Sequence, residues 1–213
     1  LHDALPISAA LLVMSEPIVR VLYERGAFAA NNSTPVVAAI LAIFGLGLPA
    51  FVLIKAFTPG YFAREDTKTP MIFAAVSVVV NVATALALFP SMGAPGIAVA
   101  SAVAGWLNAA MLLFVLVRRG HWGREAALMK RIPRLVLSAA LMGAALWYAQ
   151  GWLAAGLSSS ARLVTKAATL ALLSGAGAVL YFALAFATGG ADVGMIRRNM
   201  RRGGKAGAKP AQD

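Results

Sequence analysis

The chain has 213 residues, of which 60% are hydrophobic and only 13% are charged, and its mean hydropathy is +0.77. Soluble domains carry about 25% charged residues, so this composition excludes an ordinary water-soluble protein, and the absence of cysteine excludes disulfides and cysteine-ligated metals. The formal net charge of +11 would indicate a nucleic-acid partner for a soluble protein, but the basic residues lie between apolar runs, so we predict no such partner.

Six apolar segments come near the roughly 20 residues that a helix needs to cross a hydrocarbon core of about 30 Å. In chain order they are Leu5–Tyr23, Pro35–Phe57, Met71–Phe89, Ile97–Val117, Leu135–Leu153 and Leu163–Ala187. Their length, their Ala and Leu content and the lack of strict alternation predict helices rather than barrel strands. The predicted fold class is therefore an all-α integral membrane protein with about six transmembrane helices.

The first segment contains a charged pair. Glu16 precedes Arg20 by four residues, a spacing that lets the two side chains pair on one face of a helix. Charged groups inside a span are costly and usually face a bundle interior or an aqueous cavity. The pair is therefore a candidate lining of a substrate cavity. The alternative is a pair near the outer membrane surface, loosened by Pro17, that only sets the depth of the helix.

The second segment carries its own helix breakers and leads into a short polar turn. Gly47 and Pro49 interrupt an apolar helix, so we predict a hinge there. The turn Arg64–Pro70 follows at the end of the segment. Thr69 and Thr34 each precede a proline and are predicted to cap the helices that follow. Prolines are predicted in the first turn of four spans, at Pro35, Pro70, Pro95 and Pro133.

The third and fourth segments each place an asparagine near their middle, at Asn81 and Asn108. An amide at this depth is a candidate contact to a polar substrate or a coupling ion. The alternative, which we favour, is an interhelical hydrogen bond. The small residues Gly96, Ala100 and Ala104 recur every four positions and predict close helix packing.

The basic residues divide unequally between the two sides of the predicted bundle. Fifteen of the 19 Lys and Arg residues lie in or beside the turn after the second segment, the turn 118–134, and the tail after the sixth segment. Basic loops stay inside the cell, so this side and the C-terminus are predicted to be cytoplasmic. Trp122 is a predicted interfacial anchor, and the basic tail is predicted to be disordered and able to attract anionic lipid.

The residue inventory gives little support for an enzyme. No two carboxylates share a span, and the sequence has no phosphate-binding loop and no metal-ligand cluster. We therefore predict no catalytic residue, no metal site and no cofactor.

Three stretches resemble the C-terminal half of the bacterial lipid II flippase family, MurJ/MviN. They are EPIVRVLYERGAF (Glu16–Phe28), GLPAFVLIKAFTPGYFAREDTKTP (Gly47–Pro70) and GIAVASAVAGWLNAA (Gly96–Ala110). The match runs from about Leu11 to Val117 and then continues in hydropathy alone. Because the chain begins with Leu1 rather than Met, we expect a C-terminal fragment in which Leu1–Asp3 need not be native.

The resemblance implies a division of the chain. Residues 1–118 would hold the family's ninth to twelfth helices, which form most of the second lobe of an alternating-access transporter, and residues 119–134 would form a basic cytoplasmic turn. Residues 135–187 would supply two extra helices that line a groove for a lipid tail, and residues 188–213 a basic tail. The implied function is translocation of lipid II, an undecaprenyl-pyrophosphate-linked precursor, across the bacterial inner membrane. Membrane lipids and cell-wall synthesis proteins are the further implied partners.

Three groups of residues carry the family's motifs. Glu16 and Arg20 match its Glu-Pro-Ile-Val-Arg sequence, and Gly47 and Pro49 match its hinge. The third group matches its cytoplasmic turn, for which we expect a gate role: Arg64, Asp66, Thr67, Thr69 and Pro70. The family's substrate-binding arginines lie upstream of this chain. Two other functions stay open: a related exporter of drugs or lipid-linked polysaccharide, and a membrane scaffold or division partner that uses the basic tail.

Overall fold

The computed structural model describes residues 4–120, 126–153 and 162–187. Within these ranges the chain forms seven α-helices and no strand: α1 (Ala4–Tyr23), α2 (Gly26–Ala30), α3 (Thr34–Phe62), α4 (Lys68–Met92), α5 (Ala94–Arg118), α6 (Ala126–Trp152) and α8 (Leu163–Ala187). Every helix except the short α2 contains a stretch long and apolar enough to cross a membrane. The six predicted spans and the all-α membrane fold are therefore confirmed. Trp122 and the basic tail lie outside the described residues.

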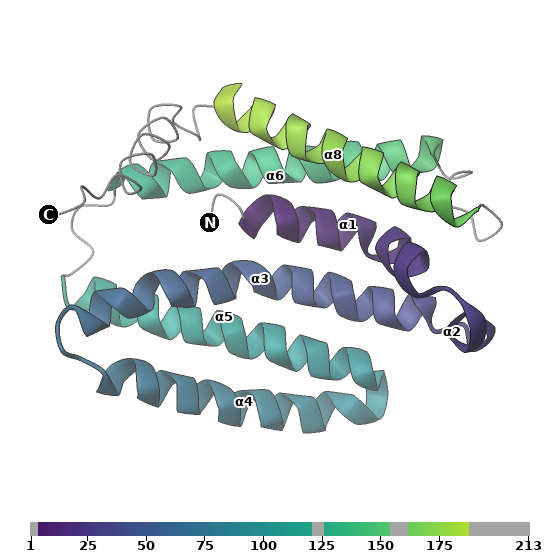
Figure 1. The fold of residues 1–213 in the computed structure, drawn as a ribbon. Coiled ribbons are helices and arrows are strands. Elements are labelled where there is room, and N and C mark those ends of the chain that lie inside the picture. Colours follow the sequence, from purple (N-terminus) through teal and green to yellow (C-terminus); the bar gives the residue numbers. More distant parts are fainter. Residues whose placement is uncertain (1–3, 121–125, 154–161, 188–213) are drawn as a thin grey trace, which may run out of the picture.

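The helices form two groups that share α1. Figure 1 shows α6 and α8 along one side of α1, and α3, α5 and α4 in succession on its other side. One apolar core lies between α1, α6 and α8 and includes Met14, Met142 and Tyr181. A second core lies between α3 and α5, where Phe57 packs with Leu112. α1 is thus the element through which the two groups contact each other.

Among the six long helices, α4 has the smallest share of buried residues. It packs mainly on α5 and makes only a slight contact with α3. Ser77 is the one fully buried residue that the described structure places on it. Its apolar side chains, such as Val79 and Leu86, are exposed and available to lipid or to a further part of the protein.

The glycines of α3 provide close helix contacts rather than a visible break. A Cβ at Gly45 would lie 3.1 Å from the Cβ of Leu11 on α1, and one at Gly47 would lie 3.4 Å from the Cα of Ala102 on α5. α3 runs without interruption through Pro49. The two glycines therefore let α3 pack tightly on two neighbours, and the hinge at Gly47 and Pro49 stays a prediction.

Two predicted helix starts are wrong. Thr34 is the first residue of α3 rather than its cap, and the preceding Ser33 makes no capping hydrogen bond through its side chain. Pro133 lies inside α6, which begins at Ala126. The residues from Ala126 to Lys130 are strong helix formers, so they extend the helix toward its N-terminus. Membrane helices tolerate an internal proline because neighbouring groups satisfy the freed carbonyl.

Each long helix runs in the direction opposite to the long helix that precedes it in the chain, so the helix ends and the described connections lie at two ends of the bundle (Figure 1). We call them the Asp66 end, with the α3–α4 turn, the last residues of α5 and the end of α8, and the Asn32 end, with α2 and the α4–α5 turn. The described helix ends from which the loops predicted to share one side lead, those of α3, α5 and α8, therefore lie at one end.

Candidate functional site

The first candidate site is the turn between α3 and α4. The N–H of Glu65 donates to the carbonyl of Phe62 at 3.0 Å, and the N–H of Asp66 donates to the carbonyl of Tyr61 at 3.2 Å. These two bonds form a Schellman motif, which satisfies the last carbonyls of a helix. The motif requires a left-handed residue, and Glu65 takes that position with a φ of +58°. The turn is therefore an ordered helix end that aims Asp66 at the start of α4.

Asp66 caps α4. Its Oδ1 accepts the N–H of Thr69 at 3.0 Å, and its Oδ2 accepts the Thr69 hydroxyl at 2.7 Å. The side chain of Thr67 makes no capping bond. The predicted cap at Thr69 is therefore wrong, because the carboxylate three residues earlier reaches the free amide and Thr69 becomes its donor.

The same carboxylate pairs with Arg119 at the end of α5. Arg119 Nη1 lies 2.5 Å from Asp66 Oδ2, although 53 residues separate the two along the chain. The guanidinium and the two bonds from Thr69 lower the pKa of Asp66 to about 2. Because that pKa lies below the ordinary aspartate value of 3.8, the pair favours folding above pH 4, and this contribution is lost as the pH falls through 2. The ion pair is thus intact throughout the neutral range.

A buried hydrogen bond lies beneath this ion pair. The Tyr61 hydroxyl donates to the carbonyl of Leu112 at 2.6 Å, and Tyr61 is only 2% exposed. Arg64, in the turn after α3, lies at the surface and donates to the carbonyl of Gly60 in the last turn of that helix. Polar contacts therefore connect the end of α3, the start of α4 and the end of α5. We call the residues that make these contacts the Asp66 cluster: Tyr61, Asp66, Thr69, Leu112 and Arg119.

A cavity of about 380 Å³ opens beside the Asp66 cluster, between α3, α4 and α5. Thr67 and Pro70 of the turn line it together with Asn108. Within the described structure, Asn108 Oδ1 is buried and accepts no hydrogen bond, so the interhelical bond that we favoured for Asn108 is not made through this atom. Asn81 is half-buried on α4.

The predicted pair on α1 is confirmed and has a third member. Arg20 pairs with Glu16 and also approaches Glu24, with Nε 3.2 Å from a carboxylate oxygen. The Glu24 side chain is 17% exposed, against 56% for Glu16. Sequence analysis missed Glu24, although the same four-residue spacing repeats from Arg20. Glu16 and Arg20 lie on α1, apart from Asn81 and Asn108 on α4 and α5, so the described residues do not unite the four predicted cavity positions.

The second candidate site is an apolar groove of about 310 Å³ between α1, α6 and α8. Ile7 and Ala10 of α1, Leu146 of α6 and Phe182 of α8 are among the residues that line it. The helices approach closely at its floor, where a Cβ added to Gly177 would lie 3.1 Å from Leu146. The groove can hold an aliphatic chain and offers almost no polar partner.

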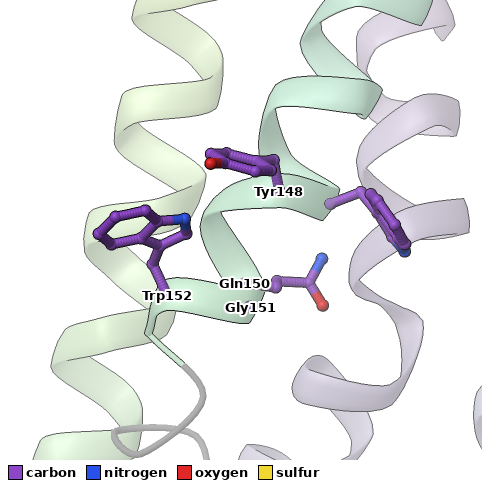
Figure 2. Close-up of a pocket in the computed structure, with 5 residues that line it drawn as sticks. Tyr148, Gln150, Gly151 and Trp152 are labelled. Atoms are coloured by element: carbon purple, nitrogen blue, oxygen red, sulfur yellow. The ribbon is translucent and has the colours of Figure 1, made fainter.

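Aromatic side chains gather where α6 reaches the Asn32 end. Tyr148, Gln150, Gly151 and Trp152 line a shallow pocket of about 640 Å³ together with Trp147 (Figure 2). Trp152 is 78% exposed. Exposed Trp and Tyr at the end of a span are typical of the membrane–water interface. We interpret the pocket as part of such an aromatic belt.

Comparison with known proteins agrees with these features. The family profile described as "Lipid II flippase MurJ" matches residues 3–191. The chain belongs to the lipid II flippase MurJ family. Together with the six spans, this membership identifies a multi-pass protein of the bacterial inner membrane.

Individual relatives cover nearly the whole chain. It is 63% identical over 202 residues to the probable lipid II flippase MurJ of Rhizobium meliloti (strain 1021), which covers 95% of this chain and 38% of that protein. It is 52% identical over 208 residues to the probable lipid II flippase MurJ of Rhizobium tropici, covering 98% and 39%. It is 32% identical over 184 residues to the one of Vibrio cholerae, covering 84% and 34%. The chain thus spans about two fifths of the length of these MurJ relatives.

Proposed function

We propose that this chain is the C-terminal part of a flippase that moves lipid II from the inner to the outer leaflet by alternating access. The observation that carries the proposal is family membership over residues 3–191, since the relatives bear the name of that activity. Translocation makes and breaks no covalent bond, so the chain needs no catalytic residue. The same comparisons favour lipid II over drugs or lipid-linked polysaccharide as the substrate.

We assign the parts of the chain to parts of the transporter according to the two helix groups. Residues 1–118 form most of the second lobe, α6 and α8 are the two extra helices, and residues 188–213 are a basic tail. The basic stretch 119–134 that was predicted as a turn belongs to α6 from Ala126 onward. The groove between α1, α6 and α8 receives the lipid tail, because its walls are apolar and its volume suits a chain rather than a headgroup. Cell-wall synthesis proteins stay predicted partners.

The Asp66 end is proposed to face the cytoplasm, because most of the chain's basic residues lie in segments that adjoin this end in the sequence. The C-terminus would then also be cytoplasmic. The Asp66 cluster would be a gate contact that holds one state of the transport cycle, with the turn residues from Arg64 to Pro70 as its frame.

Filling the groove tests this function. In the full-length flippase, Ala178→Trp on α8 places an indole on the groove lining, and we expect a severalfold loss of lipid II translocation, measured in vesicles as substrate accessible on the far leaflet. Ala176→Trp is the matched control, since Ala176 is exposed on the same helix and does not line the groove. Equal transport by the two variants, both present at normal levels in the membrane, would show that the lipid tail does not use the groove.

A further inference from the structure

Pro17 leaves one carbonyl of α1 without its usual donor. In an α-helix the N–H of each residue bonds to the carbonyl four residues earlier, and proline has no N–H. Pro17 lies inside α1, so the affected carbonyl is that of Val13. The side chain of Gln150 on α6 takes the place of the missing amide: its Nε2 donates to the Val13 carbonyl at 3.1 Å.

The replacement is specific to this pair of helices. Figure 2 shows Gln150 extending from α6 on the side of α1, whereas Trp152 extends on the opposite side, where α8 runs. The hydrogen bond is part-buried and joins residues 137 positions apart. Because Pro17 supplies no N–H, the donor from α6 satisfies the Val13 carbonyl within the protein and ties the position of α1 to that of α6.

A second side-chain bond to a helix carbonyl shows the contrast. Trp106 Nε1 on α5 donates to the carbonyl of Leu46 on α3 at 3.0 Å. The carbonyl freed by Pro49, four residues earlier, is that of Gly45 rather than Leu46. The Trp106 bond therefore adds to a helix that already has its own donor, while the Gln150 bond substitutes for one.

We infer that Gln150 is a positioning residue that completes α1 at its proline break and fixes α6 against it. Val13 lies one turn after the groove residue Ala10, and Gln150 lies one turn after the groove residue Leu146. The bond therefore sets the spacing of two groove walls, and a movement of α1 at Pro17 is transmitted to α6. The effect on the lipid tail rests on the proposed function of the groove, but the bond itself does not.

A double-mutant cycle in the full-length protein tests the bond separately from transport. Gln150→Leu removes the donor, and Pro17→Ala supplies the missing backbone N–H. We expect Gln150→Leu to lower the thermal unfolding midpoint when residue 17 is proline. The expected change is a roughly threefold increase in the unfolding equilibrium constant, which is typical of losing an interhelical bond in a membrane. The same substitution should have no effect when residue 17 is alanine. An equal loss in both backgrounds would overturn the inference.

Trp106→Phe is the matched control, because its bond does not depend on Pro17 and its effect should be the same in both backgrounds. If Pro17→Ala fails to fold, an isotope label on the Val13 carbonyl replaces the cycle. Its infrared stretching frequency should rise in Gln150→Leu, as expected for a carbonyl that loses its donor, and an unchanged frequency would also overturn the inference.

The consequence for transport has its own readout. A photoactivatable polyprenyl phosphate serves as the probe of the groove. Gln150→Leu should weaken probe labelling of α8 and raise the KM for lipid II more than it lowers kcat, and Pro17→Ala should restore both. If the unfolding cycle shows coupling while labelling and KM do not change, the bond is structural only and Gln150 does not position the groove.

Discussion

Charged side chains form one cluster at each end of this bundle, and the two clusters are built differently. At the Asp66 end, the carboxylate of Asp66 joins Arg119, which lies 53 residues away on another helix. At the Asn32 end, Glu16 and Arg20 of α1 and Glu24 directly after it follow one another at four-residue spacing. The first cluster depends on how α5 is placed against the α3–α4 turn, whereas the second depends only on α1 being a helix.

This difference indicates which cluster can change when helices move during the transport cycle. A charged ladder on one helix moves with that helix and is unchanged by a rigid-body movement of its neighbours. An ion pair between two elements has to break when those elements separate, so it can favour one of two arrangements. The Asp66 cluster is therefore the better candidate for a gate.

The largest effect is expected from Asp66→Asn. The amide oxygen of asparagine can still accept the Thr69 N–H, so α4 keeps its cap, while the charge that attracts Arg119 is lost. A coupling between two sites or states is typically about fivefold or more. We therefore expect transport to fall by about that factor, while the unfolding free energy falls by no more than the small contribution of a solvent-exposed ion pair. Both are measured on the full-length protein.

Neighbouring arginines provide the control for this variant. Arg119→Gln should reproduce the transport defect of Asp66→Asn, and combining the two should add little, because the variants remove one interaction. Arg118→Gln, one position earlier on α5, should leave transport unchanged. Normal transport and normal stability in Asp66→Asn would rule out the gate hypothesis.

A smaller effect is expected from Glu16→Gln at the opposite end. Pairs four residues apart on an exposed helix face contribute about 0.2–0.5 kcal/mol, and the Glu16 side chain is 56% exposed. We therefore expect the unfolding free energy to change by no more than about 0.5 kcal/mol. A severalfold loss of transport without loss of stability would instead support the cavity role predicted for Glu16 and Arg20.

The same contrast explains what the sequence could reveal. The pairing of Glu16 with Arg20 follows from helical spacing, and the spans follow from length and hydropathy. The partner of Asp66 could not be predicted, because Arg119 is distant in sequence and one basic residue among many. The role of Gln150 could not be predicted from periodicity either. Pro17 predicts that one carbonyl of its helix lacks a donor, but the sequence does not show which residue supplies the replacement.

A local rule failed at the start of α4. Thr69 was predicted to cap that helix, but the carboxylate of Asp66 is the better acceptor and takes the role. Both groups are suitable and lie three residues apart, so the sequence did not show which of them would act. At Gly47 and Pro49, α3 is helical throughout and Gly47 lies close to Ala102 of α5, while the hinge there stays a prediction.

Glycine substitutions in the turns at the two ends test the backbone conformation rather than a charge. Both turns are Schellman motifs with a left-handed residue, Glu65 with a φ of +58° and Asn32 with a φ of +49°. The left-handed conformation costs an ordinary residue about 1–2 kcal/mol, while asparagine tolerates it. We therefore expect Glu65→Gly to raise the unfolding free energy by about 1 kcal/mol and Asn32→Gly to change it by much less.

Glu65→Gly could also stabilise the protein and slow transport. In that case the backbone strain at Glu65 normally destabilises the state in which Asp66 binds Arg119, because removing strain from one state favours that state over its alternative. Equal stabilisation by the two glycines would mean that the side chain of Glu65 carries no special cost, and the Asp66 cluster would then depend on the ion pair alone.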